Sequence, residues 1–305
     1  MYIIDFFKNL FRKKNTGLII WLVLNTALII AIFSNGFASW KGALVGLGIY
    51  LVSLVIALSP LGEWILRLQT GCKKMTNPDD IARLQPLFDE VYAKAKAKNP
   101  ELPSDIKLFI CEDDTPNAFA TGRKTVCVNR GFFSYSDEHI KAVLGHEFGH
   151  LAHKDTDAIL VVSVGNLIVT AIFVIIRILA TIFLTIAQVV ASSGRGITGV
   201  LGYIFTGMGK LAANVMLALL MRLWTQLGTW LCMSSSRGKE FEADQYSQEC
   251  GYGDSLCEVL ASFGSGGSSS KGLFASLSAS HPDTDKRIAN LKALPAPGTQ
   301  AQLPN

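Results

Sequence analysis

Four long apolar segments constrain this chain more than any other feature of its sequence. Thr16–Phe33 and Gly42–Gly62 contain no charged residue, and neither does Ala158–Ile176. A fourth candidate, Leu211–Met233, is interrupted by Arg222. Because about 20 apolar residues can cross the hydrocarbon core of a bilayer as a helix, the sequence predicts a mainly α integral membrane protein with about four transmembrane helices.

Composition agrees with a membrane protein. Half of the residues are hydrophobic, only 17% are charged, and the mean hydropathy is +0.34, which is not the profile of a soluble enzyme. The first apolar segment is not read as a cleaved signal, because no small-x-small site follows it and a second apolar segment comes almost at once. The net charge of +4 lies mostly near the membrane ends. It favours anionic lipid headgroups as partners rather than nucleic acid.

Basic residues flank the first two apolar segments on the outer sides. They are Lys8, Arg12, Lys13 and Lys14 before the first, and Arg67, Lys73 and Lys74 after the second, whereas the short loop between holds Lys41 alone. By the positive-inside rule both ends of this helical hairpin are cytoplasmic. In the later segments Arg177 ends the third apolar run, and Arg222 either snorkels, lines a groove or marks a segment at the membrane face.

The chemistry-bearing motif is His146-Glu147-Phe148-Gly149-His150. On a helix, residues four apart share one face, so His146 and His150 can hold one metal ion between them. Glu147 then lies beside the pair, where its carboxylate can reach a water molecule at the metal. A helix is expected here, because Ser136 is a suitable N-cap and an apolar face follows. The spacing is typical of zinc peptidases.

Catalytic zinc usually takes three protein ligands, so a third must come from elsewhere. His139 and His153 are expected to be surface side chains, since three ligands on one helix cannot surround a tetrahedral ion. The better candidates are Glu240 and Asp244 in the segment Ser236–Asp244. They are four apart and share one helical face, so one can bind the metal while the other orients a ligand histidine.

Several motifs together resemble the HtpX-type membrane zinc metalloproteases. These are gluzincins related to the CAAX prenyl protease and the mitochondrial Oma-type protease. The resemblance rests on the His146–His150 motif, Ser236–Asp244, Ser280-His281-Pro282 with Arg287, and Asn117–Gly122. The stretch Gly264–Ser270 departs from the family pattern.

The resemblance implies a role for each matching residue. One Zn²⁺ would be held by His146, His150 and Glu240, with Glu147 as the catalytic residue and Asp244 orienting a ligand histidine. His281 would contact the oxyanion and Arg287 would brace the site. An edge strand made of Asn117, Ala118, Phe119 and Ala120 would pair with extended substrate.

One constraint links the site to the membrane topology. If His146, His150 and Glu240 hold one ion, the chain between them crosses the bilayer an even number of times. Two crossings would place the loop near Arg195 outside and the peptidase domain in the cytoplasm. The six cysteines fit a reducing compartment, because they form no Cys-x-x-Cys pair.

The remaining segments predict a small α+β domain. Asp79–Lys98 reads as one or two amphipathic helices divided at Pro86, and Ile106–Cys111 reads as a strand. Asn117–Thr121 and Thr125–Asn129 flank Gly122-Arg123-Lys124 as a hairpin would. Ser255–Phe263 and Asp283–Leu291 should be helices, and Pro295–Asn305 has the composition of a disordered tail.

The expected organisation has five parts. They are a transmembrane hairpin over 1–75 (helices about 16–33 and 42–62), a first peptidase part with the zinc helix over 76–156, the third and fourth membrane segments over 157–234, a second peptidase part with the third ligand over 235–294, and a tail over 295–305.

The function expected from sequence is a zinc metalloendopeptidase of the bacterial inner membrane. The resemblance implies that it cuts misfolded or damaged membrane proteins at cytoplasmic sites, in quality control and stress response. No nucleotide or nucleic acid partner is expected, because no Gly-rich phosphate motif is present. A prenyl-protein endoprotease is one alternative, although four apolar segments are few to enclose its chamber. A membrane adaptor that holds zinc without catalysis is the other, and Glu147 argues against it.

Overall fold

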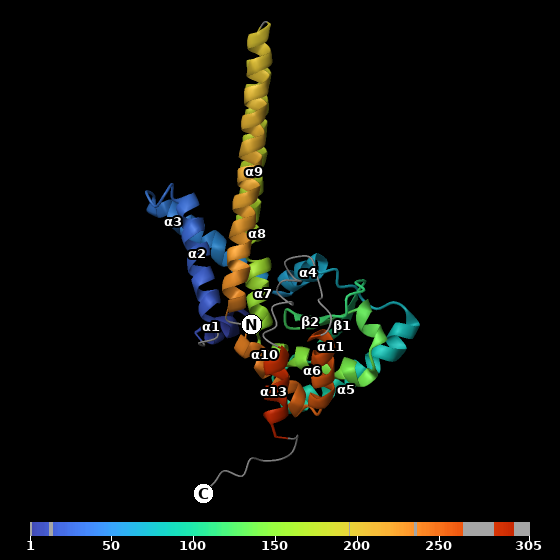
Figure 1. Cartoon of the computed structure of the whole chain (residues 1–305). Coiled ribbons are helices and arrows are strands. Elements are labelled where there is room, and N and C mark those ends of the chain that lie inside the picture. Colours follow the sequence, from blue (N-terminus) through green and yellow to red (C-terminus); the bar gives the residue numbers. More distant parts are fainter. Residues whose placement is uncertain (1, 12–14, 195, 235–236, 265–283, 296–305) are drawn as a thin grey trace. The chain divides into compact units, whose positions relative to one another are not determined.

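The computed structural model describes residues 2–11, 15–194, 196–234, 237–264 and 284–295 (Figure 1). The chain forms two compact units. Residues 1–23, 54–164 and 231–305 make one, here called the sheet unit, and residues 24–53 and 165–230 make the other, the helical unit. Helices predominate and the strands form a single small sheet, so the mainly α architecture is confirmed.

The sheet has three strands, β1 (Lys107–Cys111), β2 (Ala118–Thr121) and β3 (Thr125–Asn129). Their order is β1-β3-β2, with β1 parallel and β2 antiparallel to β3. The predicted strand at Ile106–Cys111 and the predicted hairpin are therefore confirmed. Gly122 turns the hairpin with φ +61°, a conformation that glycine adopts without steric cost. The arrangement leaves β2 at the edge of the sheet.

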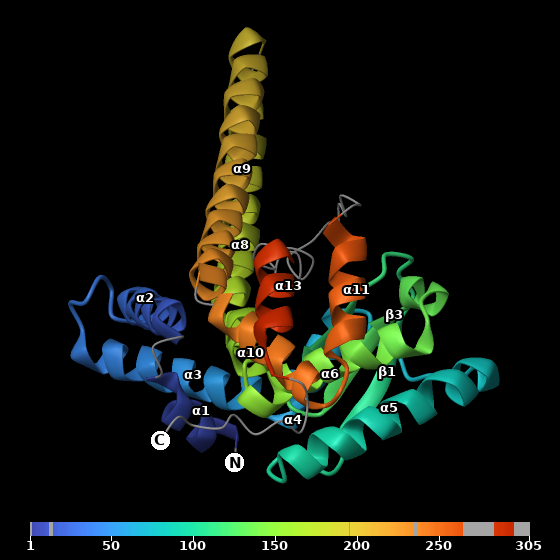
Figure 2. The same cartoon turned by 60° about the horizontal axis from the view of Figure 1, so that its bottom comes forward.

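Helix α6 (Asp137–His153) runs through the middle of the sheet unit. It packs against β2 on one side and against α10 (Arg237–Glu249) and α11 (Gly253–Gly264) on the other (Figure 2). The terminal helix α13 (Thr284–Ala293) packs on α11 and α10, and the 3₁₀ turn η2 (Arg130–Ser134) leads from β3 towards α6. The core beneath is apolar and aromatic, with Phe88, Phe148 and Tyr92 in mutual ring contact. Burial of such rings stabilises the frame that carries the motif.

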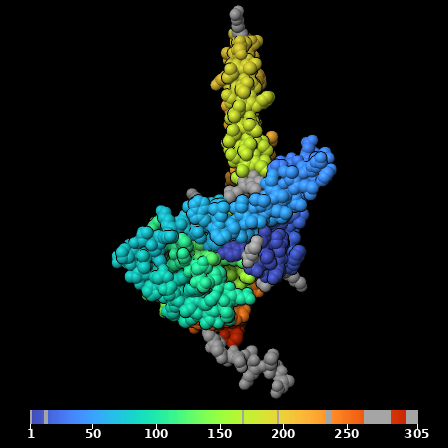
Figure 3. All heavy atoms as spheres, turned by 180° about the vertical axis from the view of Figure 1, so that it is seen from behind, coloured from blue at the N-terminus to red at the C-terminus, as the bar shows by residue number. Residues whose placement is uncertain are grey.

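Helix α5 (Pro78–Lys98) is continuous, so the possible division at Pro86 is wrong. The ring of Pro86 faces solvent, where the missing N–H costs least, and the opposite face stays packed. That buried face consists of Leu84, Leu87, Phe88, Val91 and Ala95. In Figure 3 the segment from α5 to β3, cyan to green, forms one side of the sheet unit.

The second apolar segment is two helices rather than one. Helix α3 (Trp40–Ala57) ends before Ser59, and α4 (Pro60–Gln69) begins after it, so a helix over 42–62 is a wrong boundary. The hydroxyl of Ser59 accepts hydrogen bonds from the N–H groups of Leu61 and Gly62. Pro60 at the first helical position favours a helix start there, because its fixed φ suits that position and it has no N–H to leave unpaired.

The third apolar segment is also broken. Helix α7 (Thr156–Ser163) ends before Gly165-Asn166, and the long helix α8 (Leu167–Ser192) follows. Arg177 ends the uncharged run but lies inside α8, so the helix continues past it. Its Nε donates to Asn214 Oδ1 at 3.0 Å on α9 (Ile197–Ser234), which gives one N–H of the guanidinium a polar partner.

In the described chain, four helices are long and apolar enough to cross a membrane. They are Thr16–Phe33 (helix α2), Trp40–Ala57, Val169–Ser192 and Ile197–Cys232. Within the helical unit α8 and α9 lie side by side (Figure 1), and Lys210 Nζ donates to Thr185 Oγ1 at 2.7 Å between them. Asn25 on α2 links this helix to α9, because its Oδ1 accepts a hydrogen bond from Trp224 Nε1 at 3.2 Å.

The remaining expected elements fall partly outside the described residues. The helices predicted at Ser255–Phe263 and Asp283–Leu291 correspond to α11 and α13. Most of Gly264–Ser270, all of Ser280-His281-Pro282 and nearly all of the tail lie outside the described residues. The sheet unit also contains the short N-terminal helix α1 (Tyr2–Leu10).

Candidate metal centre

The motif lies on α6, whose ends are set by local sequence. Ser136 Oγ accepts from the N–H of His139, and Asp137 with Glu138 places negative charge at the helix N-terminus. Lys154 ends the helix in the left-handed region, with φ +60°. The predicted buried face is confirmed, and it consists of Ile140, Val143, Leu144 and Leu151. This packing fixes which side of α6 presents the motif.

Close contact between α6 and α10 carries the third candidate ligand to the motif. Gly145 and Gly149 are one helical turn apart on α6, and they face Ser247 and Ala243 on α10. A Cβ at Gly149 would lie 2.8 Å from the Cα of Ala243, so only glycine permits this approach. One turn before Ala243, Glu240 reaches the two histidines.

Four atoms of the three candidate ligand residues lie close together, two imidazole nitrogens and both carboxylate oxygens of Glu240. The Nε2 atoms of His146 and His150 are 3.2 Å apart, and Glu240 lies 3.5 Å from each of them, through Oε2 and Oε1 respectively. Ligands at about 2.0–2.2 Å from a tetrahedral ion are about 3.3–3.6 Å from one another. These residues therefore form a group that can hold a metal ion, and two imidazoles with one carboxylate are a donor set that zinc takes.

Each histidine is held by a carboxylate at its other ring nitrogen. Nδ1 of His146 lies 2.9 Å from Asp244 Oδ1, and Nδ1 of His150 lies 3.3 Å from Asp155 Oδ2. Asp244 is fully buried. A partner at Nδ1 fixes the tautomer and ring orientation, which leaves Nε2 directed at the metal position. Asp244 therefore lies where it can orient His146, and Asp155, which was not predicted, lies where it can orient His150.

Arg287 on α13 binds the carboxylates of the site. Its Nε and Nη2 donate to the two oxygens of Asp244 at 2.7 and 2.5 Å, and its Nη1 lies 3.3 Å from Glu240 Oε2. The side chain is only 2% exposed. Because buried carboxylates need a compensating charge, Arg287 balances the acidic side of the group. Arg287 therefore lies where it can brace the group.

The contacts change the pKa values of the metal-free site. Burial would lower the pKa of His146, but hydrogen bonds to Asp244 and Glu240 outweigh it and raise the pKa to about 10. The pKa of His150 is also raised, since its bond to Asp155 together with the negative charges of Glu240 and Glu147 outweighs burial. Burial would raise the pKa of Asp244, yet hydrogen bonds from Arg287 and His146 hold it below its usual range. A metal ion at Nε2 would displace one proton from each imidazolium, because a ligand histidine must be neutral, and the Nδ1 proton facing Asp244 or Asp155 would remain.

Glu147 lies between the candidate ligands and the sheet. Its Oε2 accepts a hydrogen bond of 2.6 Å from the backbone N–H of Ala120 on β2. The side chain is buried, with 6% of the residue exposed. This bond joins the general-base candidate to the edge strand predicted to bind substrate.

The other sequence candidates fall into three groups. Among the described residues, His139 pairs with Glu258 on α11, and His153 packs its ring against Tyr246, so neither belongs to the metal group. Ala118 and Phe119 lie on β2 and Asn117 directly precedes it, while His281 lies outside the described residues. Asp155 was missed, although an acidic residue one turn after His150, just past the helix end, is a usable signal.

The described chain thus combines four helices long and apolar enough to cross a membrane with a His-His-Glu group that can hold a metal ion, beside a helix-borne glutamate. The chain belongs to peptidase family M48, whose profile matches residues 78–294. Over most of its length it is also similar to curated proteases named HtpX.

Similar proteins extend over almost the full length. Protease HtpX of Shewanella piezotolerans is 26% identical over 309 residues, which cover 94% of this chain and 99% of that protein. Protease HtpX of Stenotrophomonas maltophilia is 28% identical over 272 residues, covering 82% and 85%. A crystal structure of S. mikatae Ste24p is similar with a TM-score of 0.41 and 19% identity, over 89% of this chain and 61% of that chain.

Proposed function

We propose that this chain is a zinc-dependent membrane endopeptidase that cuts misfolded or damaged membrane proteins at cytoplasmic sites. The observation that carries the proposal is the spacing of 3.2–3.5 Å among the ligand atoms of His146, His150 and Glu240, with Glu147 adjacent in the sequence. Membership of peptidase family M48 supports proteolysis as the reaction.

The chemistry follows from the positions of the side chains. Zinc, when bound, supplies a Lewis acid that polarises the scissile carbonyl and acidifies water. Glu147 takes a proton from the attacking water on its carboxylate and gives it to the leaving amine. Asp244 and Asp155 keep the two ligand imidazoles oriented, and Arg287 neutralises the buried carboxylates. His281 is the proposed oxyanion contact, as the resemblance implies.

The proposed substrate site is the edge strand β2 with the preceding Asn117. An extended peptide can add to a sheet edge by backbone hydrogen bonds, and such binding tolerates many sequences. Among the described strands, β2 pairs only with β3. The proposed substrate would lie along the opposite edge of β2. Because Ala120 on this strand contacts Glu147, a peptide bound there would pass the general base.

The substrate class has its own test. Purified wild-type protein with zinc should cleave unfolded casein, and a chelator should stop the cleavage. A farnesylated peptide with a C-terminal prenyl-protease motif should be cut slowly or not at all. Preferential cleavage of the prenylated peptide would favour a prenyl-protein endoprotease. Stoichiometric zinc without cleavage of either substrate would favour a non-catalytic adaptor.

The proposed location is the bacterial inner membrane with the active site in the cytoplasm. Cysteine-labelling sites can test it in a variant whose native cysteines are replaced. The exposed positions Ala38, Glu101 and Ser193 lie in the loop between α2 and α3, in the sheet unit and after α8 respectively. An impermeant thiol reagent on intact cells should label Ala38→Cys and Ser193→Cys but not Glu101→Cys. Labelling at Glu101→Cys would mean that the peptidase domain is not cytoplasmic.

A further inference from the structure

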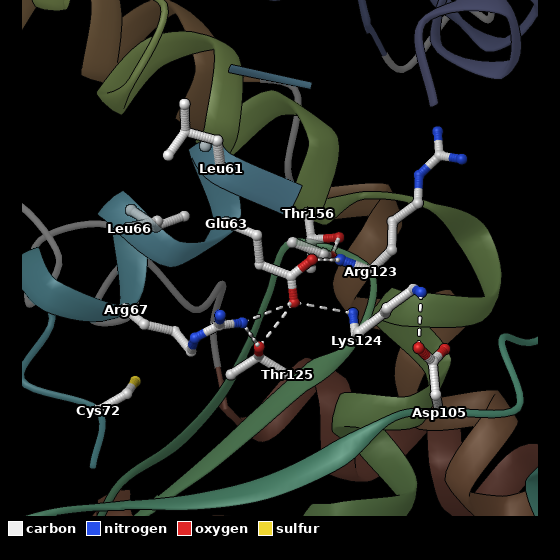
Figure 4. Close-up of polar contacts among 12 residues, drawn as sticks. Leu61, Glu63, Leu66, Arg67, Cys72, Asp105, Arg123, Lys124, Thr125 and Thr156 are labelled. Atoms are coloured by element: carbon white, nitrogen blue, oxygen red, sulfur yellow. Dashed lines mark hydrogen bonds and ion pairs between the residues drawn. The ribbon is translucent and has the colours of Figure 1, made fainter. Parts of the chain in front are cut away.

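A second buried polar cluster lies away from the metal group, at the turn of the β2–β3 hairpin (Figure 4). Its centre is Glu63 on α4, which is only 2% exposed. Glu63 directly follows the apolar segment Gly42–Gly62, and the sequence predicts no role for it. A buried carboxylate needs several donors to offset its lost hydration, and the hairpin turn supplies them.

The donors come from three consecutive residues and one arginine. Glu63 Oε2 accepts from the N–H of Arg123 at 3.3 Å, and Oε1 accepts from the N–H of Lys124 at 3.1 Å. The hydroxyl of Thr125 donates to Oε1 at 2.6 Å, and Arg67 Nη1 lies 3.4 Å from the same oxygen. Glu63 therefore binds the backbone of the turn through two N–H groups, in addition to the side chains of Thr125 and Arg67.

The turn is built to fit around this carboxylate. Gly122 has φ +61°, and a Cβ there would lie 2.4 Å from the carboxyl carbon of Glu63. On the other side Arg123 turns its guanidinium away from Glu63 and binds Asp157 through Nε and Nη2, at 3.0 and 2.7 Å. The same guanidinium donates to Asp5 Oδ2 at 2.9 Å. Helices α4, α7 and α1 thus hold the turn from separate directions.

The held turn lies next to the contact with Glu147. Thr121 pairs with Thr125, and Ala120 pairs with Val126, so Ala120 is one rung from the residue whose hydroxyl binds Glu63. The N–H of Ala120 donates to Glu147 at 2.6 Å. A shift of the turn would move this N–H, and misplacement of a catalytic group by about 1 Å can reduce a rate about 100-fold.

We propose that Glu63 is a positioning residue for peptide hydrolysis, which holds the β2–β3 turn so that β2 keeps Glu147 in place. The proposal rests on the proposed function for its kinetic consequence. Glu63 touches neither the ligand group nor Glu147, so it acts through the strand. Its loss should reduce kcat while zinc binding is retained, because no candidate ligand contacts the cluster.

The test uses the full-length zinc-loaded protein and casein-derived peptides. Glu63→Leu removes the acceptor at similar volume and should lower kcat at least tenfold, with unchanged zinc content. Glu63→Gln keeps one oxygen for the turn N–H groups and should restore part of kcat. The matched control is Asp105→Asn, which removes an exposed ion pair with Lys124 from the same turn and should leave kcat unchanged.

Amide hydrogen exchange provides a readout independent of cleavage. In Glu63→Leu the peptide covering residues 117–129 should exchange faster, while α6 keeps its wild-type protection. If Glu63→Leu does not fold, Thr125→Val should fold, since valine suits a strand, and should show a several-fold lower kcat.

Wild-type kcat in a folded Glu63→Leu protein would overturn the proposal, as would wild-type kcat in Thr125→Val when Glu63→Leu does not fold. A loss of activity that only follows the loss of zinc or of folded protein would also overturn it. If the wild-type protein cleaves nothing, the proposed function fails, and the exchange measurement still decides whether Glu63 holds β2.

Discussion

Glu147→Gln is expected to abolish peptide cleavage while leaving zinc bound. Glu147 is not among the three residues of the candidate metal group, and glutamine is nearly isosteric with it. A general acid–base residue contributes about 10²- to 10⁴-fold to the rate, so kcat should fall by at least two orders of magnitude. Casein cleavage and zinc content measured on the same preparation check both parts of the prediction.

Two outcomes would contradict this role. Cleavage at the wild-type rate would remove Glu147 from the mechanism. Loss of zinc together with activity would show that Glu147 binds the metal or is needed to form its site. Lys141→Gln is a suitable control, because Lys141 lies on α6 but forms its ion pairs with Glu90 and Glu138, away from the metal group.

Glu240→Ala is expected to remove most of the zinc, and Glu242→Ala is expected to remove little. Both residues lie on α10, but two positions correspond to about 200° around a helix, so only one can face the ion. Glu240 is the one that faces the histidines, whereas Glu242 lines a separate cavity with Lys154 and Lys239. Loss of a partner that orients a ligand already costs about 10–100-fold in metal affinity, and loss of a ligand should cost more.

The comparison between the two variants makes this test specific. Each removes a glutamate carboxylate from the same stretch of α10, only two residues apart, so a general effect on α10 would appear in both. Zinc stoichiometry after dialysis against a weak chelator is the measurement. Equal zinc loss in the two proteins would show that the assignment of Glu240 is wrong.

The zinc helix could be predicted from sequence because its signals are local. The cap at Ser136, the apolar face of α6 and the spacing of His146 and His150 all lie within one helix. The short hairpin was equally local, with glycine at the turn. Glu240 is different, since it lies far along the chain and only the approach of α10 to Gly149 brings it to the histidines. The resemblance supplied that residue, and spacing alone could not choose between it and Asp244.

The boundaries of the apolar helices were predicted less well. Hydropathy alone does not show that Ser59 and Pro60 start a new helix after α3, or that the chain breaks at Gly165-Asn166. The contacts of Glu63 could not be predicted for a related reason. A charged residue just beyond an apolar run looks like the end of a membrane segment, and its partners belong to a turn about 60 residues later. Such contacts depend on tertiary packing.

The most direct test of the account is cleavage measured as zinc is returned to metal-free protein. Casein cleavage should be absent without metal, should rise with added zinc and should saturate near one zinc per chain. The Glu147→Gln protein should take up the same amount of zinc and remain inactive throughout. Full cleavage by metal-free wild-type protein, or no cleavage by wild-type protein with one zinc bound, would contradict the central claim that this site is a zinc peptidase centre.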